Sequence, residues 1–136
     1  MIARKRSWLK DADGGSATEF AMVVPVFFAL VFAVIHLSFV MWTETSLHWA
    51  AETAARCASV NAPLGTMSGG CATGNAITAT SVQSYAVTQY HGPNLSPTFT
   101  YTTPTCGKQV KGTASYPVNL VVTSVTMNLS AQACYP

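Results

Sequence analysis

The chain has 136 residues, of which 49% are hydrophobic and only 9% are charged, and its formal net charge is +2. This length accommodates one small domain together with a membrane segment. The positive charge lies in residues 1–14, and the remainder has as many acidic as basic side chains. The body of the protein therefore offers no basic field for nucleic acid.

A basic head precedes a long apolar run at the N-terminus. No side chain from Phe20 to Trp42 is charged, and a helix needs about 20 such residues to cross a bilayer core. The run is too long for an ordinary secretory signal, and no small-residue cleavage site of that kind follows it. Because basic residues stay on the cytoplasmic side, we predict a cytoplasmic N-terminus and export of everything after Trp42.

Glu19 stands at the entrance to this run. A carboxylate near hydrocarbon is costly unless it has a partner, so its presence indicates a function. The helix is expected to begin near Ser16, with Ser16 or Thr18 as its N-cap. Pro25 removes one backbone hydrogen bond and is expected to kink or loosen the helix. Two readings of Pro25 stay open: a tolerated membrane proline, or a soft joint that lets the helix unwind when it is packed in a filament.

After Trp42 the pattern becomes that of an amphipathic helix. Its apolar stripe, which recurs every three or four residues, is nearly all alanine: Leu47, Ala50, Ala51, Ala54 and Ala58. This stripe is expected to dock on the chain's own sheet, with packing against another helix as the alternative. Two acid–base pairs have the i, i+4 spacing that favours ion pairs on the wet face: Glu44 with His48, and Glu52 with Arg56. Trp42 and Trp49 suit a membrane interface.

The C-terminal half is predicted to be α+β. Pro63 is expected to stop the helix, and residues 77–90 are predicted to form a short second helix. Three stretches rich in Thr, Val and Tyr are predicted to be strands, at residues 98–103, 109–117 and 122–133. We expect these strands to form an antiparallel meander packed on the long helix.

All four cysteines follow Trp42 and are therefore exported. An even number in an oxidising compartment predicts two disulfides, whereas zinc is disfavoured because no C-x-x-C pair occurs. In a meander the third strand ends beside the start of the second, which favours a bridge between Cys106 and Cys134. The other bridge is then Cys57–Cys71, which closes the loop after the helix.

The exported part lacks the groups that most enzymes need. After Glu52 there is no Asp or Glu, which excludes a carboxylate pair, a Ser-His-Asp triad and a calcium cage in the domain beyond it. No glycine-rich phosphate loop follows a strand. We therefore expect no enzyme activity, no cofactor, no metal and no small-molecule substrate.

The N-terminal junction resembles that of type IV prepilins, which are cut after a Gly so that a Glu stands fifth in the mature chain. Cleavage between Gly14 and Gly15 places Glu19 fifth, whereas cleavage after Gly15 would place it fourth. Glu19-Phe20 is similar to the Tad (Flp) branch, and three stretches resemble the TadE-like pseudopilins: residues 17–25, 50–56 and 110–117. The resemblance implies processing by a prepilin peptidase and assembly with other Tad pilins through Glu19, Phe20 and Pro25.

These observations give four segments. Residues 1–14 are a cleaved cytoplasmic leader, 15–42 the membrane and assembly helix, 43–60 its exported extension, and 61–136 a periplasmic or extracellular domain. The predicted function is that of a minor pseudopilin of a Tad pilus, anchored in the inner membrane and supporting pilus biogenesis and surface adhesion. The alternative is a membrane-anchored, exported binding module outside any filament. A type II secretion pseudopilin is disfavoured by Glu19-Phe20 and by the lack of acidic calcium ligands.

Overall fold

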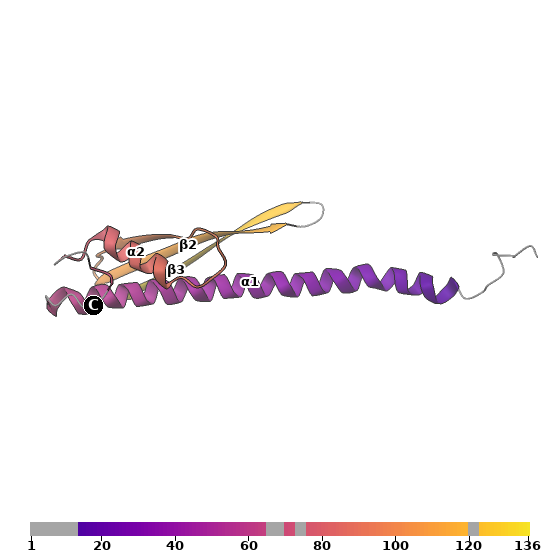
Figure 1. Cartoon of the computed structure of the whole chain (residues 1–136), viewed down its shortest axis with the longest axis horizontal. Helices are drawn as coiled ribbons and strands as arrows, with labels where there is room; N and C mark the ends of the chain where they lie inside the picture. The colour runs from indigo at the N-terminus through magenta and orange to yellow at the C-terminus, as the bar shows by residue number, and fades with distance from the viewer. Residues whose placement is uncertain (1–13, 65–69, 73–75, 120–122) are drawn as a thin grey trace, which may run out of the picture. The chain divides into compact units, whose positions relative to one another are not determined.

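The computed structural model describes residues 14–64, 70–72, 76–119 and 123–136, and the chain divides into two units, residues 1–36 and 37–136. One helix, α1 (Gly14–Leu64), passes through both units (Figure 1). The second unit adds one helix and three strands: α2 (Ala79–Gln89), β1 (Thr98–Thr102), β2 (Lys108–Asn119) and β3 (Ser124–Tyr135). The predicted α+β class and element order are confirmed.

Element ends differ from the predictions by a few residues. Helix α1 continues to Leu64 and so ends one residue after Pro63, where we expected it to end at residue 60. Helices usually end at or before the residue that precedes a proline, so the end of α1 departs from this tendency. Residue 122, predicted within the third strand, and residues 1–13 of the predicted leader lie outside the described part.

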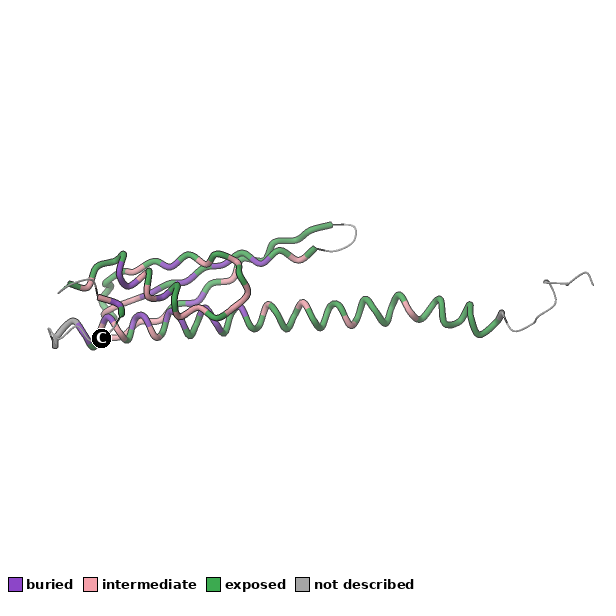
Figure 2. Tube along the Cα trace, viewed as in Figure 1, coloured by how far each residue is buried: buried purple, intermediate pink, exposed green. Residues whose placement is uncertain are grey.

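The sheet is the predicted meander, in the order β1-β2-β3 with antiparallel neighbours. Strands β2 and β3 pair along their whole length, from Lys108 opposite Tyr135 to Asn119 opposite Ser124. Along most of β2, buried residues alternate with exposed ones, as a sheet with one wet face requires. Figure 2 shows the same alternation in the β2 trace.

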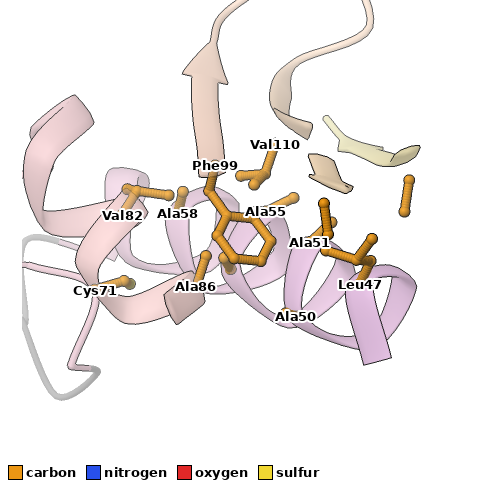
Figure 3. Close-up of a cluster of buried hydrophobic side chains, with 13 residues drawn as sticks. Leu47, Ala50, Ala51, Ala55, Ala58, Cys71, Val82, Ala86, Phe99 and Val110 are labelled. Carbon is orange, nitrogen blue, oxygen red and sulfur yellow. The ribbon is translucent and has the colours of Figure 1, made fainter. Parts of the chain in front are cut away.

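The core of the second unit forms where the alanine stripe of α1 meets the sheet and α2. Ala50, Ala51, Ala54, Ala55 and Ala58 are fully buried. Together with Leu47 they pack in one cluster with side chains of α2, β1 and β2: Val82, Ala86, Phe99 and Val110 (Figure 3). Docking on the chain's own domain is therefore the correct reading of the stripe, because small side chains let the helix approach closely.

Gly112 in β2 marks the tightest approach in this core. A Cβ atom there would lie 2.6 Å from the ring of Phe99 and 3.3 Å from the side chain of Leu47. Its lack of a side chain lets a strand, an aromatic ring and helix α1 meet at one place.

Two disulfides fix the ends of this unit, and both are the predicted pairs. Cys57 in α1 is bridged to Cys71, and Cys106 in the β1–β2 turn is bridged to Cys134 in β3, each with Cα atoms 6.2 Å apart. Near the first bridge, the amide of Asn61 donates to the Cys57 carbonyl at 2.9 Å and approaches both sulfurs, at 3.3 and 3.6 Å. This amide is therefore satisfied although Asn61 is nearly buried.

Candidate assembly site

The described part of the N-terminal segment is helical from its first residue. Helix α1 begins at Gly14, and the Thr18 hydroxyl donates to the Gly15 carbonyl at 2.8 Å. Ser16 and Thr18 thus lie inside the helix, and the prediction that one of them is the N-cap is wrong. A Thr hydroxyl that bonds back to a carbonyl three residues earlier is compatible with a helix interior.

Gly15 is not required by packing. A Cβ atom at this position would meet nothing within 4 Å, so a larger side chain would fit without steric conflict in this conformation. The glycine therefore has no structural explanation in the folded unit. A requirement for an accessible, flexible backbone at a cleavage site would account for it.

Glu19 is the only acidic residue in the first unit's described part, residues 14–36. It is exposed and lies beyond the first turn of α1, which itself contains no acidic side chain. Within the described chain, no hydrogen bond or ion pair to its carboxylate is observed. The interaction of Glu19 with the helix dipole is consequently weak, because that effect falls off within the first turn.

The apolar run beyond Glu19 is exposed on every side of α1. Phe20 and Met22 are 71% and 80% exposed, and the exposed set continues through the helix to Trp42. Rings along this segment contact each other, Phe27 with Phe28 edge-on and Phe28 with Phe32 stacked. Such an all-round apolar helix requires lipid or other helices as its surroundings.

Pro25 lies within this segment, and α1 runs through it without a break in its helical assignment. The chain therefore tolerates the missing amide hydrogen within one helix. The role of Pro25 as a soft joint stays a prediction.

Helix α1 also contains an 18-residue window that is long and apolar enough to cross a membrane, and none of this window is buried. The helix therefore fits a single-pass membrane anchor by its length and composition.

The two ion pairs predicted on α1 beyond Trp42 do not form. Neither Glu44 with His48 nor Glu52 with Arg56 makes an ion pair among the residues that the structure describes. The Glu52 carboxylate instead accepts a hydrogen bond of 2.9 Å from the Tyr135 hydroxyl. Exposed ion pairs contribute little free energy, so a neutral partner competes with them easily.

Two tyrosines of the domain have shifted pKa values. The hydrogen bond to Glu52, with smaller effects of burial and of the Glu52 charge, raises the pKa of Tyr135 above its ordinary value. Burial raises the pKa of Tyr90, and its contact with the Thr43 hydroxyl opposes this effect. Both phenols thus stay neutral at physiological pH and serve as hydrogen-bond donors.

The described residues contain no cluster of three His, Cys, Asp or Glu side chains that would hold a metal ion. A shallow depression of about 300 Å³ is lined by His48, Glu52 and the last residues of β3, with Tyr135 bonded to Glu52 inside it. The residues that line this depression do not form the nucleophile and base pair of a catalytic site.

The comparison with protein families concerns this N-terminal segment. Residues 14–56 match the family described as TadE-like protein. This segment, 43 of the 136 residues, is similar to TadE-like proteins. The match begins at Gly14, where α1 begins, includes Glu19 and Pro25, and ends at Arg56 beside the first disulfide.

The TadE-like match supports a general association with the Tad pilus and confirms the resemblance of residues 17–25 and 50–56. The strand resemblance at residues 110–117 lies outside the TadE-like match. No curated protein and no solved structure matches the chain. The sheet and α2 are consequently described by this structure alone.

Proposed function

We propose that this chain is a minor pseudopilin of a Tad pilus and enters the pilus or its assembly complex through the N-terminal part of α1. The TadE-like match supports the Tad association. The observation that carries the proposal is Glu19, an exposed carboxylate without a pairing partner in the described chain, at the start of a helix that is otherwise apolar on all sides. A simple membrane anchor has no use for such a charge.

The proposed mechanism begins with a prepilin peptidase that cuts between Gly14 and Gly15. Cleavage creates an ammonium group at Gly15, about one helical turn from Glu19. In a staggered array, the amine of one subunit meets the Glu19 carboxylate of its neighbour as both leave the headgroup region. Pairing lowers the cost of burying each charge, and a wrong stagger leaves both unpaired. The pair thus acts on the register between subunits more than on stability.

The rest of the proposal follows from this placement. The basic leader keeps the N-terminus in the cytoplasm. The part of the chain beyond Trp42 is therefore periplasmic until the subunit is incorporated. Other Tad pilins are the partners, and pilus biogenesis with surface adhesion is the outcome. Phe20 and Pro25 belong to the same segment of α1, Phe20 as an exposed contact and Pro25, five residues further along, as the joint.

The substitution Glu19→Ala tests the proposal. It is expected to leave membrane insertion and both disulfides intact and to abolish incorporation into pili, because the new N-terminal amine loses its partner. The measurement is immunoblotting of sheared pili against the membrane fraction. Glu19→Gln, which keeps the shape and removes the charge, is expected to fail in the same way.

Glu44→Ala is the matched control, because Glu44 is an exposed carboxylate on the same helix beyond the apolar run. It is expected to assemble like the parent. If Glu19→Ala also assembles and supports adhesion normally, Glu19 is only a helix-end charge. The membrane-anchored binding module outside a filament then becomes the better description of the protein.

A further inference from the structure

Two exposed tryptophans share one face of α1 in the second unit. Trp42 and Trp49 are 49% and 58% exposed and seven residues apart, which places them about two turns apart on the same side of the helix. His91, which follows α2, joins them around a shallow depression of about 330 Å³ that Thr45 and Ser46 also line. We call Trp42, Trp49 and His91 the aromatic patch.

The aromatic patch is separate from the core and from the proposed assembly residues. Both indoles lie outside the buried cluster of Leu47 and the alanine stripe. Exposed aromatic residues gathered around one depression are typical of an interaction surface. An indole has an apolar body and one N–H donor, which suits the boundary between hydrocarbon and water.

The position of the patch along the helix indicates what it contacts. The apolar run ends at Trp42, so this residue stands where the chain leaves the hydrocarbon. Trp49 lies about 10 Å further along the axis, and the headgroup layer on each side of a bilayer is about 5–8 Å thick. An upright helix would hold the backbone of Trp49 about 2–5 Å beyond the outer limit of this layer. A tilt of about 20°, the average for membrane helices, lowers this height by less than about 1 Å. Helical side chains lean toward the N-terminus, however, and this lean brings the indole of Trp49 back toward the headgroups.

His91 adds a polar group to the same surface. Its Nδ1 atom lies 2.7 Å from the Gln89 carbonyl oxygen, which assigns the ring proton to Nδ1 as the donor to that carbonyl. The Nε2 atom is then left for water or lipid. A ring fixed in this way presents a hydrogen-bonding group beside two indoles.

We propose that the aromatic patch is a lipid-docking surface, which holds the exported domain against the headgroup layer of the bilayer before the subunit enters the pilus. This rests on the membrane anchoring in the proposed function and extends it to the folded domain. The ligand is the glycerol and phosphate region of phospholipids. In this arrangement, the face of α1 that contains both tryptophans is turned toward the bilayer surface.

Depth-resolved quenching of Trp49 fluorescence tests this proposal. The full-length chain with Trp8→Phe keeps the whole aromatic patch and is placed in phosphatidylcholine vesicles. The Trp49 emission is the difference between this chain and the same chain with Trp49→Phe. Lipids brominated near the headgroup end of the acyl chain are expected to quench its emission, and the aqueous quencher acrylamide is expected to quench it weakly. His91→Asp, which places a carboxylate in the patch, is expected to cause a loss of the lipid quenching.

The matched control has all three tryptophans replaced by Phe and carries Val60→Trp. Val60 is 50% exposed on the same helix and lies about 16 Å beyond Trp49, so it is expected to respond to acrylamide only. Non-reducing electrophoresis verifies that each variant retains both disulfides. If Trp49 responds like the Val60→Trp control, the proposal is overturned.

A second outcome would also overturn it. If Trp49 is shielded from both quenchers and becomes accessible when the protein is diluted into excess lipid, another copy of the chain covers the patch instead of lipid. The vesicles contain no other pilus protein, so the quenching does not depend on assembly. The Glu19→Ala experiment can thus fail while this one succeeds, and the reverse also holds.

Discussion

At the scale of single residues, Gly112 has the clearest structural role. Gly112→Ala is expected to destabilise the domain by about 1–3 kcal/mol, because the added methyl group must displace the buried Phe99 ring. Thermal unfolding of the full-length protein in detergent micelles measures the effect. Lys111→Ala, one residue away on the exposed face, is the control and is expected to change stability by less than about 0.5 kcal/mol.

A variant Gly112→Ala that is as stable as the parent would mean that Phe99 has room to move.

Residue contacts of this kind were only partly predictable from sequence. The disulfide pairs followed from the meander, whereas the Tyr135 bond to Glu52 joins residues that are 83 positions apart. No spacing rule anticipates such a bond, and the i, i+4 rule pointed to Arg56 instead because it considers one helix in isolation.

At the scale of elements, the alanine stripe determines how closely α1 approaches its domain. Ala55→Leu is expected to destabilise the domain by about 1–3 kcal/mol, because three more carbon atoms must enter a fully packed space. Thermal unfolding in micelles again measures the change. Arg56→Leu is the control, since Arg56 is exposed on the same turn, and it should unfold close to the parent temperature.

If Ala55→Leu is as stable as the parent, the expectation is wrong, and the packing between α1 and the sheet has room for a larger side chain. The stripe was predictable because its period of three to four residues is a direct consequence of helix geometry. The start of α1 was not, since Ser16 and Thr18 fit an N-cap as well as a helix interior. Helix α2 begins where Thr78 and Ser81 form a reciprocal capping box, a signal that a Ser in place of the usual Glu or Gln obscures.

At the scale of the whole molecule, the proposed cleavage would divide the chain into a leader and a subunit. We expect the mature protein to begin at Gly15, because cleavage there places Glu19 fifth. Gly14→Leu is expected to leave the leader attached, since a bulky side chain obstructs the extended backbone that a protease needs. N-terminal sequencing of the protein from sheared pili and from membranes measures both outcomes.

Ala17→Leu serves as the control, because it changes a neighbouring small residue within the helix and not the bond itself. A mature chain that begins at Ser16 would correct the register by one residue, and any other start would contradict the assignment. The sequence predicted this segment through its charges and its apolar length. The proposed partner of Glu19 belongs to another subunit, so the structure of a single chain leaves that pairing a prediction.

The two disulfides also determine how the second unit responds to mechanical load. A pull between α1 and the C-terminus passes directly from Cys57 to Cys71 and from Cys106 to Cys134, so the loops that these bridges close bear no tension. Only the chain from Cys71 to Cys106, which contains α2 and β1, can be drawn out. Its contour length is about 120 Å, at about 3.4 Å per residue. The β2–β3 hairpin therefore bears no tension, and the extension of the domain under load has a fixed maximum.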